Sequence, residues 1–170
     1  MRRRNLIVTL AAAALLAGCA EMRPFFQQPA NRVPDLLNGT LIVLRHTERE
    51  GEDLTPAGWI RAAALPEALA GIEIDGIYAP DTQRNIDTAR PLAEARGLEV
   101  QIIPAVDIAR TMFARQPGGT LVWIGNKANL AGLWEEIAAA GDPPILYGDL
   151  FIVPMNGLRA ARVERSRFGG

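Results

Sequence analysis

The sequence predicts an α/β fold in which a mostly parallel sheet carries helices on both faces and ends in an antiparallel edge. Short apolar, β-branched runs alternate with segments that have helix start and stop signals. These runs are apolar at successive positions, as expected of strands that are buried on both faces. Near the end of the chain, Asn156 and Gly157 separate two strand-like segments, as in a hairpin. We therefore expect a three-layer α/β/α sandwich.

The first element is a central strand over residues 40–44, which read TLIVL. A helix is predicted next, because Thr55 suits the N-cap, Pro56 suits the first helical position, and Gly71 is a stop signal. The later elements follow from similar signals: strands over 76–79, 98–103 and 120–124, helices over 84–96 and 129–140, and a final strand pair over 150–153 and 158–163.

Length and charge narrow the possible functions. The chain has 170 residues, 49% of them hydrophobic, with a formal net charge of −1, which suits one globular domain of ordinary size. It has no basic field for binding nucleic acid. It also has no metal-ligand cluster and no glycine-rich nucleotide loop, so we expect neither a metal nor a cofactor.

The N-terminal segment has the features of an export signal. Three arginines (residues 2–4) precede an apolar stretch over residues 6–16, which is too short for a stable membrane span. Leu16-Ala17-Gly18-Cys19 resembles the box at which bacterial lipoproteins are cleaved and acylated. An ordinary secretory signal with a chance cysteine is the alternative, but Cys19 is the only cysteine and stands at the cleavage position.

We therefore divide the chain into a lipoprotein signal peptide (1–18), a lipidated tether (19–38) and a domain (39–170). The tether contains three prolines and no helical or alternating pattern. By resemblance to known lipoproteins, Ala20 after the cysteine indicates the outer membrane. The expected location is the bacterial cell envelope, with the domain anchored by lipid at Cys19 and facing the periplasm.

Polar residues follow three of the predicted strands. Arg45 and the only histidine, His46, follow the first strand, residues 80–84 follow the second, and Gly125 and Asn126 follow the strand at 120–124. Ligands of parallel sheets bind outside the carboxyl ends of the strands. We therefore expect these three loops to open on one side of the sheet.

Four segments, in order, resemble the histidine phosphatase (phosphoglycerate mutase-like) superfamily. Arg45-His46-Thr47-Glu48 resembles its Arg-His-Gly/Ala-Glu signature, and LTPAGWIRAAAL (54–65) resembles the pattern of its first helix. IYAPDTQRNIDTARPLAEARGL (77–98) is similar to the stretch that holds its second arginine, here Arg84. DLFIV (149–153) and the following hairpin look like the C-terminal edge of the short bacterial branch.

The resemblance implies a phosphate site. Guanidinium groups neutralise and orient phosphate oxygens, which is the implied role of Arg45 and Arg84. His46 would be the nucleophile that carries the phosphoryl group covalently, with its second ring nitrogen held by a backbone acceptor. The ligand would be a phosphorylated small molecule or an envelope phosphoester. A strand-end histidine with a structural hydrogen bond is the alternative for His46.

The chain departs from the family pattern at the position of a second histidine. Asn126 stands there and is the expected substitute ligand for a phosphate oxygen, although an amide carries no charge. The proton donor has two interpretations: Asp107 is a catalytic acid, or Asp107 is only the N-cap of a helix over 107–116. Glu48 is better explained as a partner for an arginine than as an acid.

Two functions follow from this pattern. The first is an exported, membrane-anchored phosphomonoester hydrolase that acts through a phosphohistidine at His46 and is weakened by the missing histidine. The second is a non-catalytic pseudo-phosphatase that binds phosphorylated ligands at the envelope. Because Arg45, His46 and Arg84 are all present, the sequence favours the hydrolase.

Overall fold

The structure is a computed structural model that describes residues 38–170. The predicted signal peptide (1–18), Cys19 and residues 20–37 of the predicted tether lie outside this range. Within it, no helix is long and apolar enough to cross a membrane. The same residues contain no group of three or more His, Cys, Asp or Glu side chains that could hold a metal ion.

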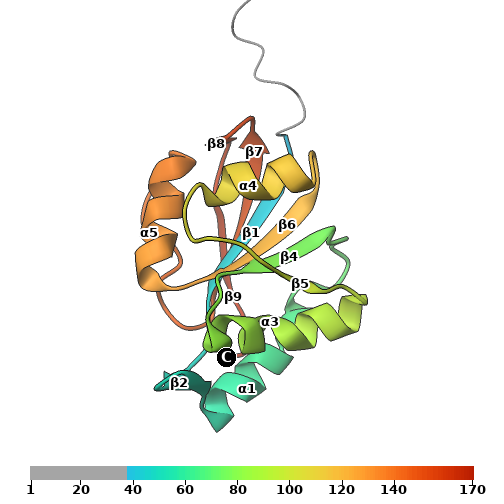
Figure 1. Cartoon of the computed structure of the whole chain (residues 1–170), viewed down its shortest axis with the longest axis vertical. Coiled ribbons are helices and arrows are strands. Elements are labelled where there is room, and N and C mark those ends of the chain that lie inside the picture. The colour runs from blue at the N-terminus through green and yellow to red at the C-terminus, as the bar shows by residue number, and fades with distance from the viewer. Residues whose placement is uncertain (1–37) are drawn as a thin grey trace, which may run out of the picture. The chain divides into compact units, whose positions relative to one another are not determined.

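The domain is an α/β sandwich built on a seven-stranded sheet, which confirms the predicted fold class (Figure 1). The strands are β1 (Thr40–Arg45), β2 (Arg49–Glu50), β3 (Asp53–Leu54), β4 (Gly76–Ala79), β5 (Val100–Ile102), β6 (Thr120–Gly125), β7 (Asp149–Asn156), β8 (Arg159–Ala160) and β9 (Glu164–Arg167). The helices are α1 (Pro56–Ala63), α2 (Leu65–Ala68), α3 (Gln83–Arg96), α4 (Ile108–Arg115) and α5 (Lys127–Glu136).

The strand order β5-β4-β6-β1-β7 places β1 inside the sheet. β4, β5, β6 and β1 pair in parallel, and β7 pairs antiparallel with β1. β8 and β9 both pair antiparallel with β7, so the antiparallel edge is also as predicted. β1 is central because four consecutive residues, Leu41 to Leu44, are fully buried.

Each face of the sheet has its own hydrophobic core. Leu41 and Val43 of β1 face α4 and α5, where they share a cluster with Phe113 and Leu133. The alternate residues, Ile42 and Leu44, belong to a second cluster on the other face, which includes side chains of α2 and α3. Figure 1 shows α4 and α5 apart from α1 and α3, in agreement with the two clusters. The period of two along a strand produces this division.

Two helices differ in extent from the prediction. The helix expected to run from Pro56 to Gly71 breaks at Ala64 into α1 and α2. Pro66 causes the break, since proline lacks an N–H donor and its ring clashes with the carbonyl four residues earlier. α5 begins at Lys127 and ends at Glu136, short of the predicted residue 140. Ala138 adopts a positive φ of 49°, which is incompatible with helix continuation.

Gly58 brings α1 into contact with the segment that follows His46. A Cβ atom at Gly58 would lie 2.1 Å from the backbone oxygen of Glu48, which is far inside van der Waals contact. Gly132, in the middle of α5, has nothing within 4 Å of the equivalent point. Gly132 can therefore serve as a control for Gly58, because both glycines are helical but only Gly58 contacts another segment.

We predict that Gly58→Ala lowers the free energy of unfolding by about 1–3 kcal/mol, because the backbone at Glu48 must move. Gly132→Ala should raise it by about 0.5–1 kcal/mol, through helix propensity and a less flexible unfolded chain. Urea denaturation of residues 38–170 measures both values. Equal effects of the two substitutions would contradict the close approach of α1 to Glu48.

Candidate functional site

Four of the residues singled out in the sequence line one pocket of about 300 Å³. Arg45 and His46 come from the end of β1, Arg84 from the first turn of α3, and Asn126 from the start of α5. The structure thus brings together three loops that follow strands β1, β4 and β6. The pocket also has Arg49, Lys127 and Ala128 in its lining.

His46 is held rigidly at the base of this site. Its backbone N–H donates to the carbonyl of Gly125 at 2.9 Å, and its side chain is nearly fully buried. Its ring Nδ1 lies 2.8 Å from the carbonyl oxygen of Thr47. A carbonyl only accepts, so Nδ1 carries the proton and the neutral ring keeps its lone pair on Nε2. This is the tautomer that a nucleophile requires.

The surroundings of His46 favour the neutral ring. The pKa of His46 is lowered from 6.5 to about 4, mainly by burial and then by the positive charges of Arg45, Arg84 and Arg49, against the opposing hydrogen bond to Thr47. The imidazole is therefore unprotonated at neutral pH. An unprotonated Nε2 beside several cations can attack an electrophile that carries negative charge.

Arg45 is oriented by the loop that precedes β7. Its Nη1 donates to the carbonyl of Ile145 at 3.0 Å and its Nη2 to the hydroxyl of Tyr147 at 3.2 Å. The guanidinium also lies 4.1 Å from the centre of the Tyr147 ring. Within the described residues, its buried Nε has no hydrogen-bond partner. The Nε–H group of Arg45 is thus a buried donor that the contacts within the described residues leave unpaired.

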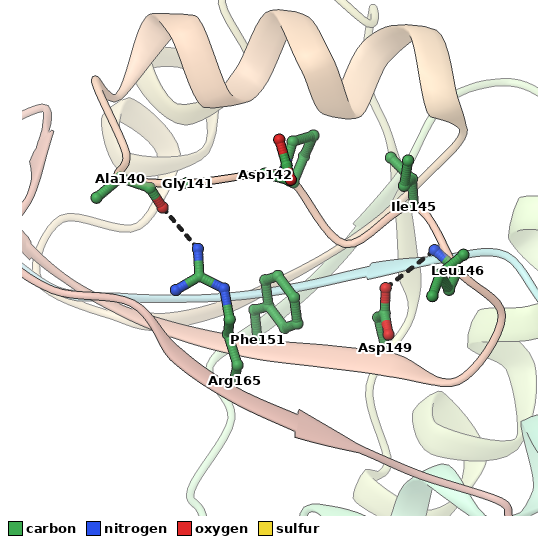
Figure 2. A pocket seen from close by; sticks show the side chains of 9 residues that line it. Ala140, Gly141, Asp142, Ile145, Leu146, Asp149, Phe151 and Arg165 are labelled. Atoms are coloured by element: carbon green, nitrogen blue, oxygen red, sulfur yellow. Dashed lines mark hydrogen bonds between the residues drawn. The ribbon is translucent and has the colours of Figure 1, made fainter.

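The loop that orients Arg45 is itself tied to the sheet (Figure 2). The backbone N–H of Leu146 donates to Asp149 Oδ2 at 2.9 Å, and Arg165 donates to the carbonyl of Ala140 at 2.6 Å. A larger pocket of about 580 Å³ lies between these contacts. It contains neither His46 nor Arg84, and its only lining cation, Arg165, lies over the ring of Phe151. We therefore place the chemistry in the smaller pocket.

Arg84 is paired with a carboxylate. Its Nη1 donates to Glu52, on the loop between β2 and β3, while its Nε is buried and has no partner in the described part of the chain. Glu52 is two-thirds exposed, whereas the Arg84 side chain is 14% exposed. Glu52 thus accepts from an N–H group of Arg84 that a bound phosphate would otherwise use.

Thr47 and Thr88 connect the two arginine-bearing elements. The backbone N–H of Thr47 donates to Thr88 Oγ1 at 3.1 Å, and the Thr88 hydroxyl donates to the carbonyl of Arg84 at 2.8 Å. Both threonines are fully buried. The chain of bonds fixes Arg84 relative to His46. Thr88 was noted in the sequence as part of a motif, but nothing local indicated that Thr47 lies beside it.

Asn126 is committed in part to capping α5. Its Oδ1 accepts from the backbone N–H groups of Ala128 (3.1 Å) and Asn129 (3.2 Å), and Asn129 Oδ1 accepts from the Asn126 N–H at 2.8 Å. This reciprocal pair is a capping box. Only the amide NH₂ of Asn126 is left to face a ligand in the pocket. That Asn126 binds a phosphate oxygen stays a prediction, and the donor would be this NH₂ group.

Asp107 lies apart from the His46 pocket. It is exposed at the N-cap of α4, as the helix interpretation required, and it lines another pocket with Glu136. The sequence-based assignment of Asp107 as the proton donor therefore has no support from its position. Its side chain does not cap the helix either, because Glu136 accepts from the N–H groups of Ala109 and Arg110. The long-range contact with Glu136 is not visible in the sequence.

Glu48 pairs with an arginine, as expected, and the arginine is Arg61. The Glu48–Arg61 ion pair has an N–O distance of 2.7 Å, and this contact lowers the pKa of Glu48. Arg61 also donates to the carbonyls of Phe168 and Gly169. Glu48 is therefore a structural anion that fastens α1 and the C-terminal segment beside the site.

The sequence model of the histidine phosphatase superfamily (branch 1) matches residues 42–107. This segment contains Arg45, His46 and Arg84. Over this segment the chain is similar to that superfamily. No curated protein sequence matches the chain. The proposed replacement of a second histidine by Asn126 lies beyond the matched segment.

Several solved structures share the fold, and phosphatases are among them. YhfR of Bacillus stearothermophilus is 16% identical with a TM-score of 0.62, covering 72% of this chain and 94% of its own. The mycobacterial glucosyl-3-phosphoglycerate phosphatase in complex with inorganic phosphate is 16% identical with a TM-score of 0.56, covering 78% and 97%. The protein histidine phosphatase SixA in complex with tungstate is 13% identical with a TM-score of 0.57, covering 76% and 95%. At these identities the likeness establishes the fold.

The Glu52–Arg84 pair leads to a prediction about anion affinity. Replacing the carboxylate by an amide in Glu52→Gln frees Arg84 and removes a negative charge beside the pocket, so inorganic phosphate should bind about threefold to tenfold more tightly. Calorimetric titration at low ionic strength measures this. Glu50→Gln, at an exposed position on the neighbouring strand β2, removes the same charge without touching Arg84. An equal gain in both variants would show that net charge alone is responsible.

Proposed function

We propose that the domain is a phosphomonoester hydrolase that forms a phosphohistidine at His46. The observation that carries the proposal is the state of His46: its Nδ1 proton is held by the Thr47 carbonyl, and its neutral Nε2 belongs to a pocket lined by Arg45 and Arg84. The family match over residues 42–107 and the phosphatases among the structural neighbours support this choice.

In the first proposed step, Nε2 of His46 attacks phosphorus and the bond to the leaving oxygen breaks. Arg45 and Arg84 neutralise the charge on the peripheral phosphate oxygens, and the Asn126 amide donates to one of them. In the second step, water attacks the phosphohistidine, the P–N bond breaks, and inorganic phosphate leaves. The liberated proton passes to solvent, and His46 returns to its neutral form.

The pocket favours esters whose leaving group is already acidic. The lining residues Arg45, His46, Arg49, Arg84, Asn126, Lys127 and Ala128 include no carboxylic acid. Glu52, which contacts Arg84, is held as an ion-pair partner. Without a positioned acid, the leaving oxygen must depart as an anion or take its proton from solvent, which slows alkyl esters more than aryl esters.

The same observation favours a second candidate, a pseudo-phosphatase that binds phosphorylated ligands without turnover. Arg45 and Arg84 would then act only as an anion clamp. The two candidates make the same prediction for binding and opposite predictions for covalent chemistry. Trapping of the phosphorylated protein separates them.

We predict that the domain incubated with ³²P-labelled 4-nitrophenyl phosphate gains an acid-labile, alkali-stable label and that His46→Ala gains none. Turnover should fall at least about 10³-fold in His46→Ala. Asp107→Asn should stay within about twofold of the unsubstituted domain, because that carboxyl lies outside the pocket.

After correction for substrate ionisation, the acid limb of kcat/KM should have its midpoint at about pH 4 rather than 6.5, since protonation of His46 removes the nucleophile.

Four results test the two candidates. A label that persists in His46→Ala contradicts the assigned nucleophile. Phosphate binding without label or turnover establishes the pseudo-phosphatase. Loss of the phosphate-dependent thermal shift in Arg84→Ala identifies the clamp, and no shift in the unsubstituted domain at millimolar phosphate contradicts both candidates.

We also propose that the protein acts at the bacterial cell envelope, facing the periplasm, with a lipid anchor at Cys19 in the outer membrane. The Leu16-Ala17-Gly18-Cys19 box and Ala20 support this proposal. When the full chain is expressed in a Gram-negative host, radiolabelled palmitate should enter the unsubstituted protein, and Cys19→Ala should remain unlabelled and fractionate with soluble proteins. Equal labelling of the two proteins would contradict the proposed lipid anchor at Cys19.

A further inference from the structure

Two cations in the pocket are not needed to hold a single phosphate. Arg49 and Lys127 line the same pocket as His46, and both are exposed. Arg84 has Glu52 as a counterion, but within residues 38–170 neither Arg49 nor Lys127 forms an ion pair with a carboxylate. Arg49 makes one side-chain hydrogen bond there, from Nη1 to the carbonyl of Gly51 at 2.6 Å.

The positions of these cations cost stability unless an anion is bound. Lys127 is the first residue of α5, where the helix dipole is positive and the first turn contains no acidic residue. Arg49 lies close enough to Arg45 and His46 for its charge to act on both groups. Lys127, at the positive end of α5, and Arg49, on β2, line one pocket with Arg45 and Arg84, and these like charges repel one another. Such an arrangement is relieved by a bound polyanion.

A simple phosphomonoester does not neutralise this pocket. Four cationic side chains line it, and a single carboxylate, that of Glu52, is paired with one of them. A phosphate dianion on Arg45 and Arg84 leaves Arg49 and Lys127 without a partner. Their exposure places them at the outer part of the site, where the rest of a substrate molecule would lie.

We propose that Arg49 and Lys127 form a second anion subsite, so that the preferred substrate is a phosphoester bearing another acidic group, a carboxylate or a second phosphate. This inference rests on the proposed function, since it assumes that the first phosphate occupies Arg45 and Arg84 beside His46. Arg49 is a forked donor and Lys127 a flexible one, which suits the geometry of a carboxylate or phosphate. The subsite determines specificity and takes no part in the chemical step.

Binding of two phosphonates of equal shape tests the subsite. 3-Phosphonopropionate carries a phosphonate and a carboxylate, whereas 3-phosphonopropanamide replaces the carboxylate by an amide, and the C–P bond of both resists hydrolysis. The domain should bind the carboxylate about 10-fold more tightly at low salt, and the preference should shrink as ionic strength rises. In the double variant Arg49→Gln/Lys127→Gln the two compounds should bind equally within about twofold.

The control is Arg110→Gln/Arg115→Gln, which removes two exposed charges on α4 that lie outside the pocket. It should keep the preference of the unsubstituted domain. The subsite is contradicted if both compounds bind the unsubstituted domain equally, or if the Arg49/Lys127 variant keeps the preference. If neither compound binds, the phosphate site itself is absent, and the proposed function fails together with the subsite.

Discussion

The hydrogen bond from the backbone N–H of His46 to the carbonyl of Gly125 is the contact on which the site depends. It continues the parallel β1–β6 pairing one residue beyond Arg45, where β1 ends. β1 lies between β6 and β7; its pairing with β7 ends at Leu44, and β6 alone holds the backbone of His46 through this bond. His46 therefore stands on a rigid part of the fold, and its ring needs only the Thr47 carbonyl to set its tautomer.

The same ladder determines what lies opposite His46. Gly125 is followed directly by Asn126 and the N-terminus of α5. A side chain at Gly125 is excluded, because its Cβ would lie 2.4 Å from Asn129 Oδ1, the atom that accepts from the Asn126 N–H. The end of β6, the capping box of α5 and the part of the pocket wall formed by Asn126 are therefore structurally coupled. Thr88 adds α3 to it through Thr47, which brings Arg84 to the same edge.

Sequence patterns were sufficient to predict those features of the fold and the site that depend on local chemistry. The buried run of β1, the Thr55–Pro56 start of α1 and the left-handed Gly97 after α3 each require a particular residue type at one position. The clustering of Arg45, Arg84 and Asn126 followed from the rule that strand ends of a parallel sheet meet at one edge. These inferences needed no knowledge of which side chains touch.

The contacts that were missed join residues far apart in the chain. The β9 strand consists of four exposed residues, three of them charged, and forms only because β7 offers a free edge. Aspartate is a common N-cap residue, and Asp107 also follows a strand, so the sequence was compatible with both a capping and a catalytic role. In the structure Glu136, from α5, accepts the hydrogen bonds from the first turn of α4 instead. Glu52, in the loop between β2 and β3, contacts Arg84, which lies thirty-two positions later in the chain. Such pairs are fixed by tertiary geometry, and hydrophobic periodicity carries no information about them.

The capping role of Asn126 also bears on the histidine that the family resemblance expects at this position. An imidazole is a poorer N-cap than an amide, and removal of a good cap costs about 0.5–2 kcal/mol. A histidine there would add a donor that can be charged, but it would stand among Arg45, Arg49, Arg84 and Lys127. Burial and the charges of Arg45, Arg84 and Arg49 already hold the pKa of His46 near 4, and the same arginines would favour the neutral form of a second imidazole. In this chain a neutral amide that caps α5 is therefore the donor more compatible with the pocket, while the positive charge is supplied by the three arginines and Lys127.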